Sequence, residues 1–208
     1  MTGKTNGTNH QNSAAEFTLT PEEVQRLFKA ARTDRDKLIL QVLYYGGIRR
    51  QELCGLDVPD VQFDRQRILI RQNDEDKEGK GGKGNKSRFV LVPETVLDGL
   101  KNYIGPKLRT GPLFKSERKG KRLSVRGVNH IVASIGERAK ITNPNPRLKH
   151  INPHLYRHSM ARHYLSKGGD IRKLSQLLGH ANVAITHAVY GTASEEEMQE
   201  EYRRLMGD

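Results

Sequence analysis

The sequence has one cysteine and no tryptophan among 208 residues, and aromatic residues make up only 6%. Because Cys54 is the single thiol, the chain cannot form an internal disulfide, which is typical of a reducing compartment. No run approaches the roughly 20 apolar residues that a membrane-spanning helix needs. The N-terminus lacks the charged-then-apolar pattern of a secretory signal. These absences predict a cytoplasmic protein with no membrane partner and a buried, inert Cys54.

Positive charge is what the chain has in excess. It carries 36 Lys and Arg against 24 Asp and Glu, a formal charge of +12, and its pI is about 9.9. An excess of this size predicts a polyanionic partner, most often a nucleic acid, whereas solubility alone is the plainer interpretation.

The hydrophobic pattern predicts a mainly α-helical domain with a small antiparallel β-sheet (α+β). A capping box at Thr20 and Glu23 marks the start of the first helix. Helical spacing and turn residues predict further helices near residues 34–45, 49–53, 94–103, 124–140, 153–166, 171–178 and 182–190. Two β-prone runs, 68–70 and 89–92, flank a polar, glycine-rich stretch, which predicts a hairpin with a flexible tip.

Three segments are expected along the chain. Residues 1–16 have almost no apolar content and are predicted to be a disordered lead. Residues 17–193 hold the periodic helices and both strands, and are predicted to form one domain. Residues 194–208 begin with a second capping box, Ser194 and Glu197, and predict an amphipathic helix that packs on its own domain.

Two motifs of well-known chemistry are incomplete here. Residues 79–87 approach a phosphate-binding loop, but Asn85 follows the second glycine and a strand comes next instead of a helix. His154 and His158 have the spacing of a zinc pair, but the glutamate of a zinc protease is missing and Arg157 adds a fixed positive charge. The sequence therefore predicts no metal and no cofactor.

Several polar residues stand where the surrounding pattern is apolar or turns sharply. Arg49 follows a Gly-Gly-Ile turn. His154 and Arg157 share one helix face at spacing i, i+3. His180 follows Leu-Leu-Gly, where glycine can end a helix, and Tyr190 comes ten residues later. Taken singly, each has a plainer interpretation as a core histidine, a solvated arginine or a packing tyrosine.

Together, these residues form an ordered series of motifs. The series is Gly-Ile-Arg-x-x-Glu-Leu at 47–53, Gly-Lys-Gly-Asn-Lys at 82–86, His-x-x-Arg-His at 154–158, Leu-Leu-Gly-His at 177–180, and Tyr190. It resembles the catalytic domain of the tyrosine recombinases, the phage integrase family, over roughly residues 18–204. The resemblance implies site-specific DNA recombination or integration through a 3′-phosphotyrosyl intermediate, with residues 17–193 as the catalytic domain. Type IB topoisomerase-like relaxation and a non-catalytic DNA-binding relative are the alternatives.

The resemblance also implies a role for each site residue. Tyr190 would be the nucleophile, and covalent catalysis of this kind requires neither metal nor ATP. Arg49 and Arg157 would hold phosphate oxygens with their guanidinium forks, and His180 would hydrogen-bond the same phosphate. His154 would exchange protons with the tyrosine.

The hairpin would supply the general acid that protonates the leaving 5′ oxygen. Lys83 is preferred because it occupies the Gly-Lys-Gly-Asn-Lys motif, while Lys80 and Lys86 are close competitors. Glu52 is expected to orient Arg49, and His158 to support the site from the same helix. The DNA contacts expected from basic residues are Arg50, Lys80, Lys86, Arg88, Lys115, Lys119, Lys121 and Arg122.

The resemblance further implies the partners. They would be double-stranded DNA with a specific site and three further copies of the chain on that DNA, with a monomer or weak oligomer when free. The 194–208 helix would then dock on a neighbouring subunit, in a prokaryote, virus or mobile element. Three features depart from the family. Tyr190 follows His180 one residue later than in many members, the hairpin is longer, and only some twenty residues precede the first helix. The chain is either an excised catalytic domain or a naturally minimal recombinase.

Overall fold

A computed structural model describes residues 17–71, 87–106, 110–117 and 120–179, together with Ala184 and Thr186. The elements are α1 (Pro21–Ala30), α2 (Asp34–Tyr45), α3 (Arg50–Gly55), η1 (Val58–Asp60), β1 (Val61–Gln62), η2 (Phe63–Arg65), β2 (Arg67–Ile70), β3 (Arg88–Leu91), α4 (Glu94–Ile104), α5 (Val125–Ala139), α6 (Pro153–Ser166) and α7 (Ile171–Leu178). The predicted mainly helical fold with a small antiparallel sheet is confirmed. Of the helix expected at 182–190 the structure describes only Ala184 and Thr186. The helix expected at 194–208, the lead at 1–16 and the hairpin tip lie outside the described residues. Among the described helices, none is both long and apolar enough to cross a membrane.

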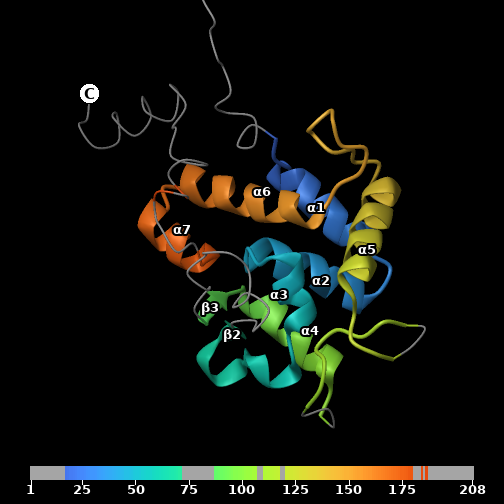
Figure 1. Ribbon diagram of the computed structural model, residues 1–208, viewed down its shortest axis with the longest axis vertical. Coiled ribbons are helices and arrows are strands. Elements are labelled where there is room, and N and C mark those ends of the chain that lie inside the picture. Colours follow the sequence, from blue (N-terminus) through green and yellow to red (C-terminus); the bar gives the residue numbers. More distant parts are fainter. Residues whose placement is uncertain are drawn as a thin grey trace, which may run out of the picture.

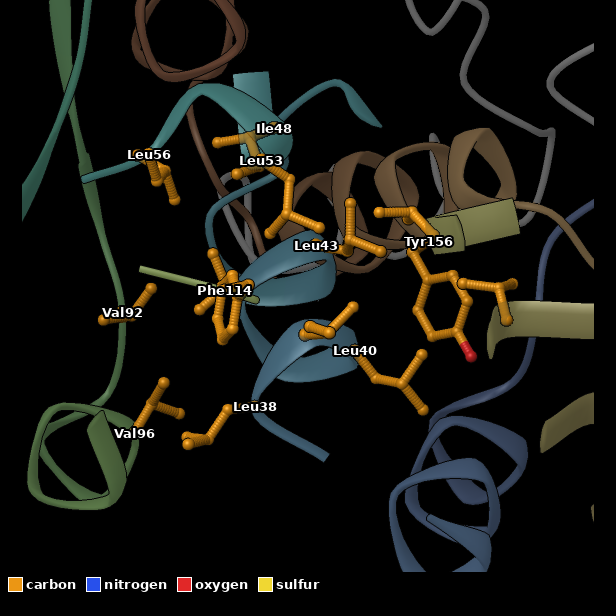
Figure 2. Close-up of a cluster of buried hydrophobic side chains, with 14 of the residues drawn as sticks. Leu38, Leu40, Leu43, Ile48, Leu53, Leu56, Val92, Val96, Phe114 and Tyr156 are labelled. Atoms are coloured by element: carbon orange, nitrogen blue, oxygen red, sulfur yellow. The ribbon is translucent and has the colours of Figure 1, made fainter. Parts of the chain in front are cut away.

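Helix α2 lies at the centre of the fold, between α1 and α6 on one side and α4 and the sheet on the other (Figure 1). Its residues Leu38, Ile39, Leu40, Val42 and Leu43 are buried, and burial on more than one face is typical of a helix enclosed by others. Figure 2 shows side chains of α2 beside those of its neighbours on both sides. The main hydrophobic core is therefore built around α2.

The sheet has the order β1-β2-β3 and both pairings are antiparallel. Ile68 lies opposite Val90, and both are fully buried. Phe89 and Leu91, at the alternate positions of β3, are exposed. Because side chains alternate between the faces of a strand, Arg88 shares the core-facing side with Val90. The sequence analysis missed β1, since two residues are too short to show a period of two.

Side-chain caps explain where most of the helices begin. The side chains of Thr20, Thr33, Ser124, Asn152 and Asp170 each accept a backbone N–H from the first turn of the helix that follows. Such caps satisfy donors that have no partner within the helix. The last two set the starts of α6 and α7, which carry much of the candidate site.

Two glycines shape the turns on either side of α6. Gly47 ends the segment after α2 with φ of +56°, and a Cβ there would lie 2.2 Å from the Met160 Cε of α6. Gly179 ends α7 with φ of +66°. Glycine adopts this left-handed region without the steric penalty that other residues meet. The turn before α3 and the end of α7 can therefore both lie close to α6.

Candidate active site

Four described segments of the chain meet at the candidate site. They are the N-terminus of α3 with Arg49, the first turns of α6 with Arg157, the first residue of β3, Arg88, and the C-terminal end of α7. Hydrogen bonds link each segment to at least one other. The site is thus assembled from parts of the sequence more than one hundred residues apart.

Arg49 precedes the first turn of α3 and is held by Glu52. The Arg49 backbone N–H donates to Glu52 Oε2 at 2.7 Å, and Arg49 Nη1 donates to Oε1 at 3.2 Å. The Arg49 side chain is 32% exposed, against 10% for Glu52. The contact expected between Glu52 and Arg49 is therefore present. Glu52 holds the backbone and the side chain of Arg49, and that side chain is partly exposed at the surface.

Glu52 is held from the other side by Arg88. Arg88 Nη1 donates to Glu52 Oε1 at 2.8 Å and Nη2 donates to Oε2 at 2.9 Å, so the two side chains form a bidentate pair. Burial raises the pKa of Glu52, but the hydrogen bonds and charge of Arg88, and then those of Arg49, outweigh it. The net pKa lies below the ordinary value, so the carboxylate is ionised at neutral pH.

The structure gives Arg88 contacts other than the DNA contact expected from the sequence. Its side chain is only 10% exposed, and its remaining nitrogen, Nε, donates to the Leu177 carbonyl oxygen at 3.1 Å. All three guanidinium nitrogens are therefore engaged inside the protein. The sequence contained a signal for this, since Arg88 shares the period-two face of β3 with buried Val90.

Arg157 is buried, with 6% of its surface exposed. Its Nη1 donates to the Gly47 carbonyl oxygen at 2.6 Å, and its Nη2 donates to the Leu178 carbonyl oxygen at 2.8 Å. These carbonyls lie at the C-terminal ends of α2 and α7, where the helix dipoles favour a cation. The guanidinium therefore ties the turn before Arg49 to the turn that precedes His180 in the sequence.

His154 lies in the first turn of α6, and His158 one turn further on. Burial lowers the pKa of His154, and the charges of Arg50, Arg157 and Arg49 lower it further. Burial likewise lowers the pKa of His158, assisted by His154 and Arg157. Both imidazoles are therefore neutral at neutral pH, and a neutral imidazole can accept a proton.

The other basic residues expected to contact DNA have varied surroundings. Arg122 donates to the Cys54 and Leu56 carbonyl oxygens and pairs with Asp57, so it closes the C-terminal end of α3. Lys115 and Arg122 form a short antiparallel bridge. Arg50 donates to Asn129 at 3.5 Å, and Lys121 is exposed. Lys80, Lys83, Lys86, Lys119, His180 and Tyr190 lie outside the described residues.

Cys54 is half-buried rather than fully buried. Burial raises the pKa of its thiol to about 11, although Arg122 and Arg50 act in the opposite direction. A thiol with such a pKa remains protonated near neutral pH and is a poor nucleophile. This agrees with the inert role predicted from the sequence.

The fold and the cluster of two arginines with a histidine define a family. The model of the phage integrase family matches residues 18–197. The chain belongs to that family.

Within this family, the chain is similar to tyrosine recombinases of the Xer type. The tyrosine recombinase XerA of Pyrococcus horikoshii is 34% identical over 185 residues, 88% of this chain and 59% of that protein. The tyrosine recombinase XerC of Listeria monocytogenes is 31% identical over 196 residues, 88% of this chain and 60% of that protein. A crystal structure of XerA recombinase matches with a TM-score of 0.72 at 32% identity, covering 94% of this chain and 65% of the other. The chain thus spans about three fifths of the length of the curated relatives it matches.

More distant structures share the fold alone. The Tn1549 transposon integrase in complex with transposon right end DNA matches with a TM-score of 0.68 at 19% identity. XerH bound to its difH substrate matches with a TM-score of 0.67 at 21% identity. The same arrangement of helices and small sheet therefore occurs at low sequence identity.

Proposed function

We propose that this chain cuts and rejoins DNA strands in site-specific recombination, through a covalent bond between Tyr190 and a DNA phosphate. The observation that carries the proposal is the fixed pair of guanidinium groups, Arg49 and Arg157, with neutral His154 beside them. Family membership and the similarity to XerA recombinase support it. The named relatives are recombinases, so topoisomerase-like relaxation is not favoured.

The reaction is a phosphoryl transfer without hydrolysis. The Tyr190 oxygen bonds to phosphorus while the bond from phosphorus to the 5′ oxygen breaks. His154 takes the tyrosine proton, and a hairpin lysine, Lys83 in preference to Lys80 or Lys86, gives a proton to the leaving 5′ oxygen. Attack by a 5′-hydroxyl on the phosphotyrosine reverses the step and rejoins a strand, so no ATP is consumed.

The arginines supply the positive charge that the transferring phosphate requires. Arg157 is held by two carbonyl oxygens and Arg49 by a buried carboxylate, so neither must reorganise when negative charge develops. A preorganised donor of this kind is worth roughly 10²–10³ in rate. We propose that His180 adds a further hydrogen bond to the same phosphate, with His158 behind His154.

The partners follow from the same proposal. Double-stranded DNA with a specific site accounts for the charge of +12, and basic residues such as Arg50 and Lys121 would contact its phosphates. Four copies on two duplexes would exchange strands, with the 194–208 helix docked on a neighbouring copy. The reaction would take place in the cytoplasm, where the DNA of a prokaryote or of its mobile elements lies.

A covalent adduct tests the proposal directly. The protein is incubated with DNA that carries its site and a nick near the cleavage position, and denaturing gels separate DNA-linked from free protein. We expect an adduct for the wild type with and without EDTA, and none for Tyr190→Phe, which lacks the nucleophilic oxygen.

The wild-type result in EDTA distinguishes this mechanism from metal-assisted cleavage. Arg49→Gln serves as the companion variant, and we expect its adduct to form roughly 10²–10³ times more slowly. An adduct that persists in Tyr190→Phe would show that another residue is the nucleophile.

A further inference from the structure

Arg88 donates hydrogen bonds both to Glu52 of α3 and to a carbonyl at the end of α7. We propose that it is a positioning residue of the cleavage reaction, which fixes Arg49 through Glu52 and anchors the C-terminal end of α7. The inference rests on the proposed DNA cleavage, and it assigns a role to a residue whose three guanidinium nitrogens all donate to groups within the protein.

The first step of the argument concerns Glu52. Its carboxylate is 10% exposed and binds two arginines. Arg88 binds both carboxylate oxygens in a bidentate pair, and this fixes the carboxylate in the plane of the guanidinium group. The same oxygens receive the Arg49 backbone N–H and Nη1. The orientation of Arg49 therefore depends on the fork from Arg88.

The second step concerns the end of α7. The last four carbonyls of a helix have no partner within the helix. Arg88 Nε donates to the carbonyl of Leu177, and Arg157 donates to that of Leu178. Two adjacent carbonyls of α7 are thus held by two arginines, directly before the Gly179-His180 turn in the sequence.

The third step concerns the contact between Gly179 and the Arg88 side chain. A Cβ at Gly179 would lie 2.6 Å from Arg88 Cδ, 2.7 Å from Nε and 2.9 Å from Cζ. The guanidinium therefore packs directly on the bare backbone of this glycine. Any side chain larger than that of glycine at position 179 would displace Arg88.

Arginine is required for this role because its donors are several and fixed in direction. Nε reaches α7 while Nη1 and Nη2 reach Glu52. Lysine has one nitrogen at the end of a flexible chain and cannot make both contacts with the same geometry. The positioning role therefore predicts that charge alone does not replace Arg88.

The test compares cleavage rate with DNA affinity in the full chain. The variants Arg88→Gln and Arg88→Lys are assayed in single turnover on the nicked DNA described above, and DNA binding is measured separately by titration. For Arg88→Gln we expect a cleavage rate reduced about 10–100-fold, the order of loss from a misplaced catalytic group. The dissociation constant should change by less than about threefold, because no phosphate contact is removed. Arg88→Lys should bind as the wild type and recover only part of the rate.

The matched control is Arg71→Gln. Arg71 directly follows β2 and pairs with the acidic residues Asp57 and Asp60, and its hydrogen bonds among the described residues reach neither Glu52 nor α7. We expect its cleavage rate to stay within about twofold of the wild type. Circular dichroism and thermal melts check that each variant is folded, and if Arg88→Gln is not, Arg88→Lys carries the comparison by the same two measurements.

Three results would overturn the inference. They are a wild-type rate in the folded Arg88 variants, equal losses of rate and affinity, which would make Arg88 a DNA contact, and an equal loss of rate in Arg71→Gln. If the wild type itself forms no adduct, the proposed function fails and the inference with it. A wild-type adduct with unaffected Arg88 variants would remove the inference alone.

Discussion

At the scale of single residues, the site is organised by arginines that bind the protein itself. Arg88 and Arg157 each donate to a carbonyl of α7, and Arg88 also binds Glu52. From the sequence, both arginines were expected to donate to DNA, whereas these contacts direct their N–H groups to the protein itself. A guanidinium with five donors can hold the protein with some of them and a phosphate with others.

The charge of Glu52 makes a prediction for stability at different pH values. Its folded pKa lies below the ordinary value because Arg88 and Arg49 outweigh burial, so its contribution to stability is present above the unfolded pKa. That contribution is lost as the pH falls through the folded pKa. For Glu52→Gln we expect a free energy of unfolding lower by about 2–4 kcal/mol at neutral pH.

Urea unfolding of wild type and Glu52→Gln from pH 7 to pH 3 measures this difference. It should be constant well above the ordinary Glu pKa of about 4.3 and shrink below it, as the pH falls towards the lower pKa of the folded carboxylate. The groups that face the Glu52 carboxylate are the guanidinium groups of Arg49 and Arg88. A difference that grows on acidification would contradict the assignment.

The candidate histidine and arginines of the site could be proposed from the sequence because their motifs are local. The roles of Arg88 and of the Leu177 and Leu178 carbonyls could not be, because they join positions 21 to 89 residues apart. For Arg88 the alternation with Val90 indicated an inward side chain, but not which group it meets.

At the scale of elements, helix ends decide the geometry. The caps at Thr20, Asn152 and Asp170 and the stop at Gly179 follow from residue types with local preferences. The sequence therefore predicted the helices of the described residues to within a few residues. It missed β1 and the two short 3-10 turns, since segments of two or three residues carry no periodicity.

Gly179 provides a prediction at this scale. Gly179→Ala places a side chain in the left-handed region and against Arg88, so we expect a loss of about 2–4 kcal/mol from backbone strain and displaced contacts. The matched control is Gly120→Ala, where φ is +59° and a Cβ would meet nothing within 4 Å. That variant should lose only about 1–2 kcal/mol.

Chemical denaturation of both alanine variants gives the comparison, and the single-turnover assay adds a functional readout. Cleavage should be slowed in Gly179→Ala and unchanged in Gly120→Ala. Equal losses of stability in the two variants would mean that contact with Arg88 adds nothing to the backbone effect.

At the scale of the whole molecule, the charge of +12 is the dominant property. Binding to DNA releases counterions, so affinity should fall steeply with salt. If the chain contacts roughly 6–10 phosphates, the association constant should drop about 10³–10⁵-fold between 50 and 200 mM salt. Titration of fluorescent duplex DNA at several salt concentrations measures the slope, and an affinity that does not change with salt would contradict a phosphate-based interface.

The organisation of the whole chain could be predicted only in part. The described helices and the small sheet could be predicted from patterns within short windows, as in α2 and β3. The central place of α2 did not, because it depends on which helices cover each of its faces. Long-range packing of this kind is not encoded in any local spacing.

The attachment of α7 has a consequence for cooperativity. Leu174 and Leu178 pack with Met160 and Ala161 in a small cluster of their own, apart from the larger core around α2. A helix of eight residues is marginal in isolation, so α7 depends on this cluster and on the two arginines. The α7 helix can thus unfold locally as a separate unit, and the end of the molecule that holds the candidate site can rearrange while the central helix stays folded.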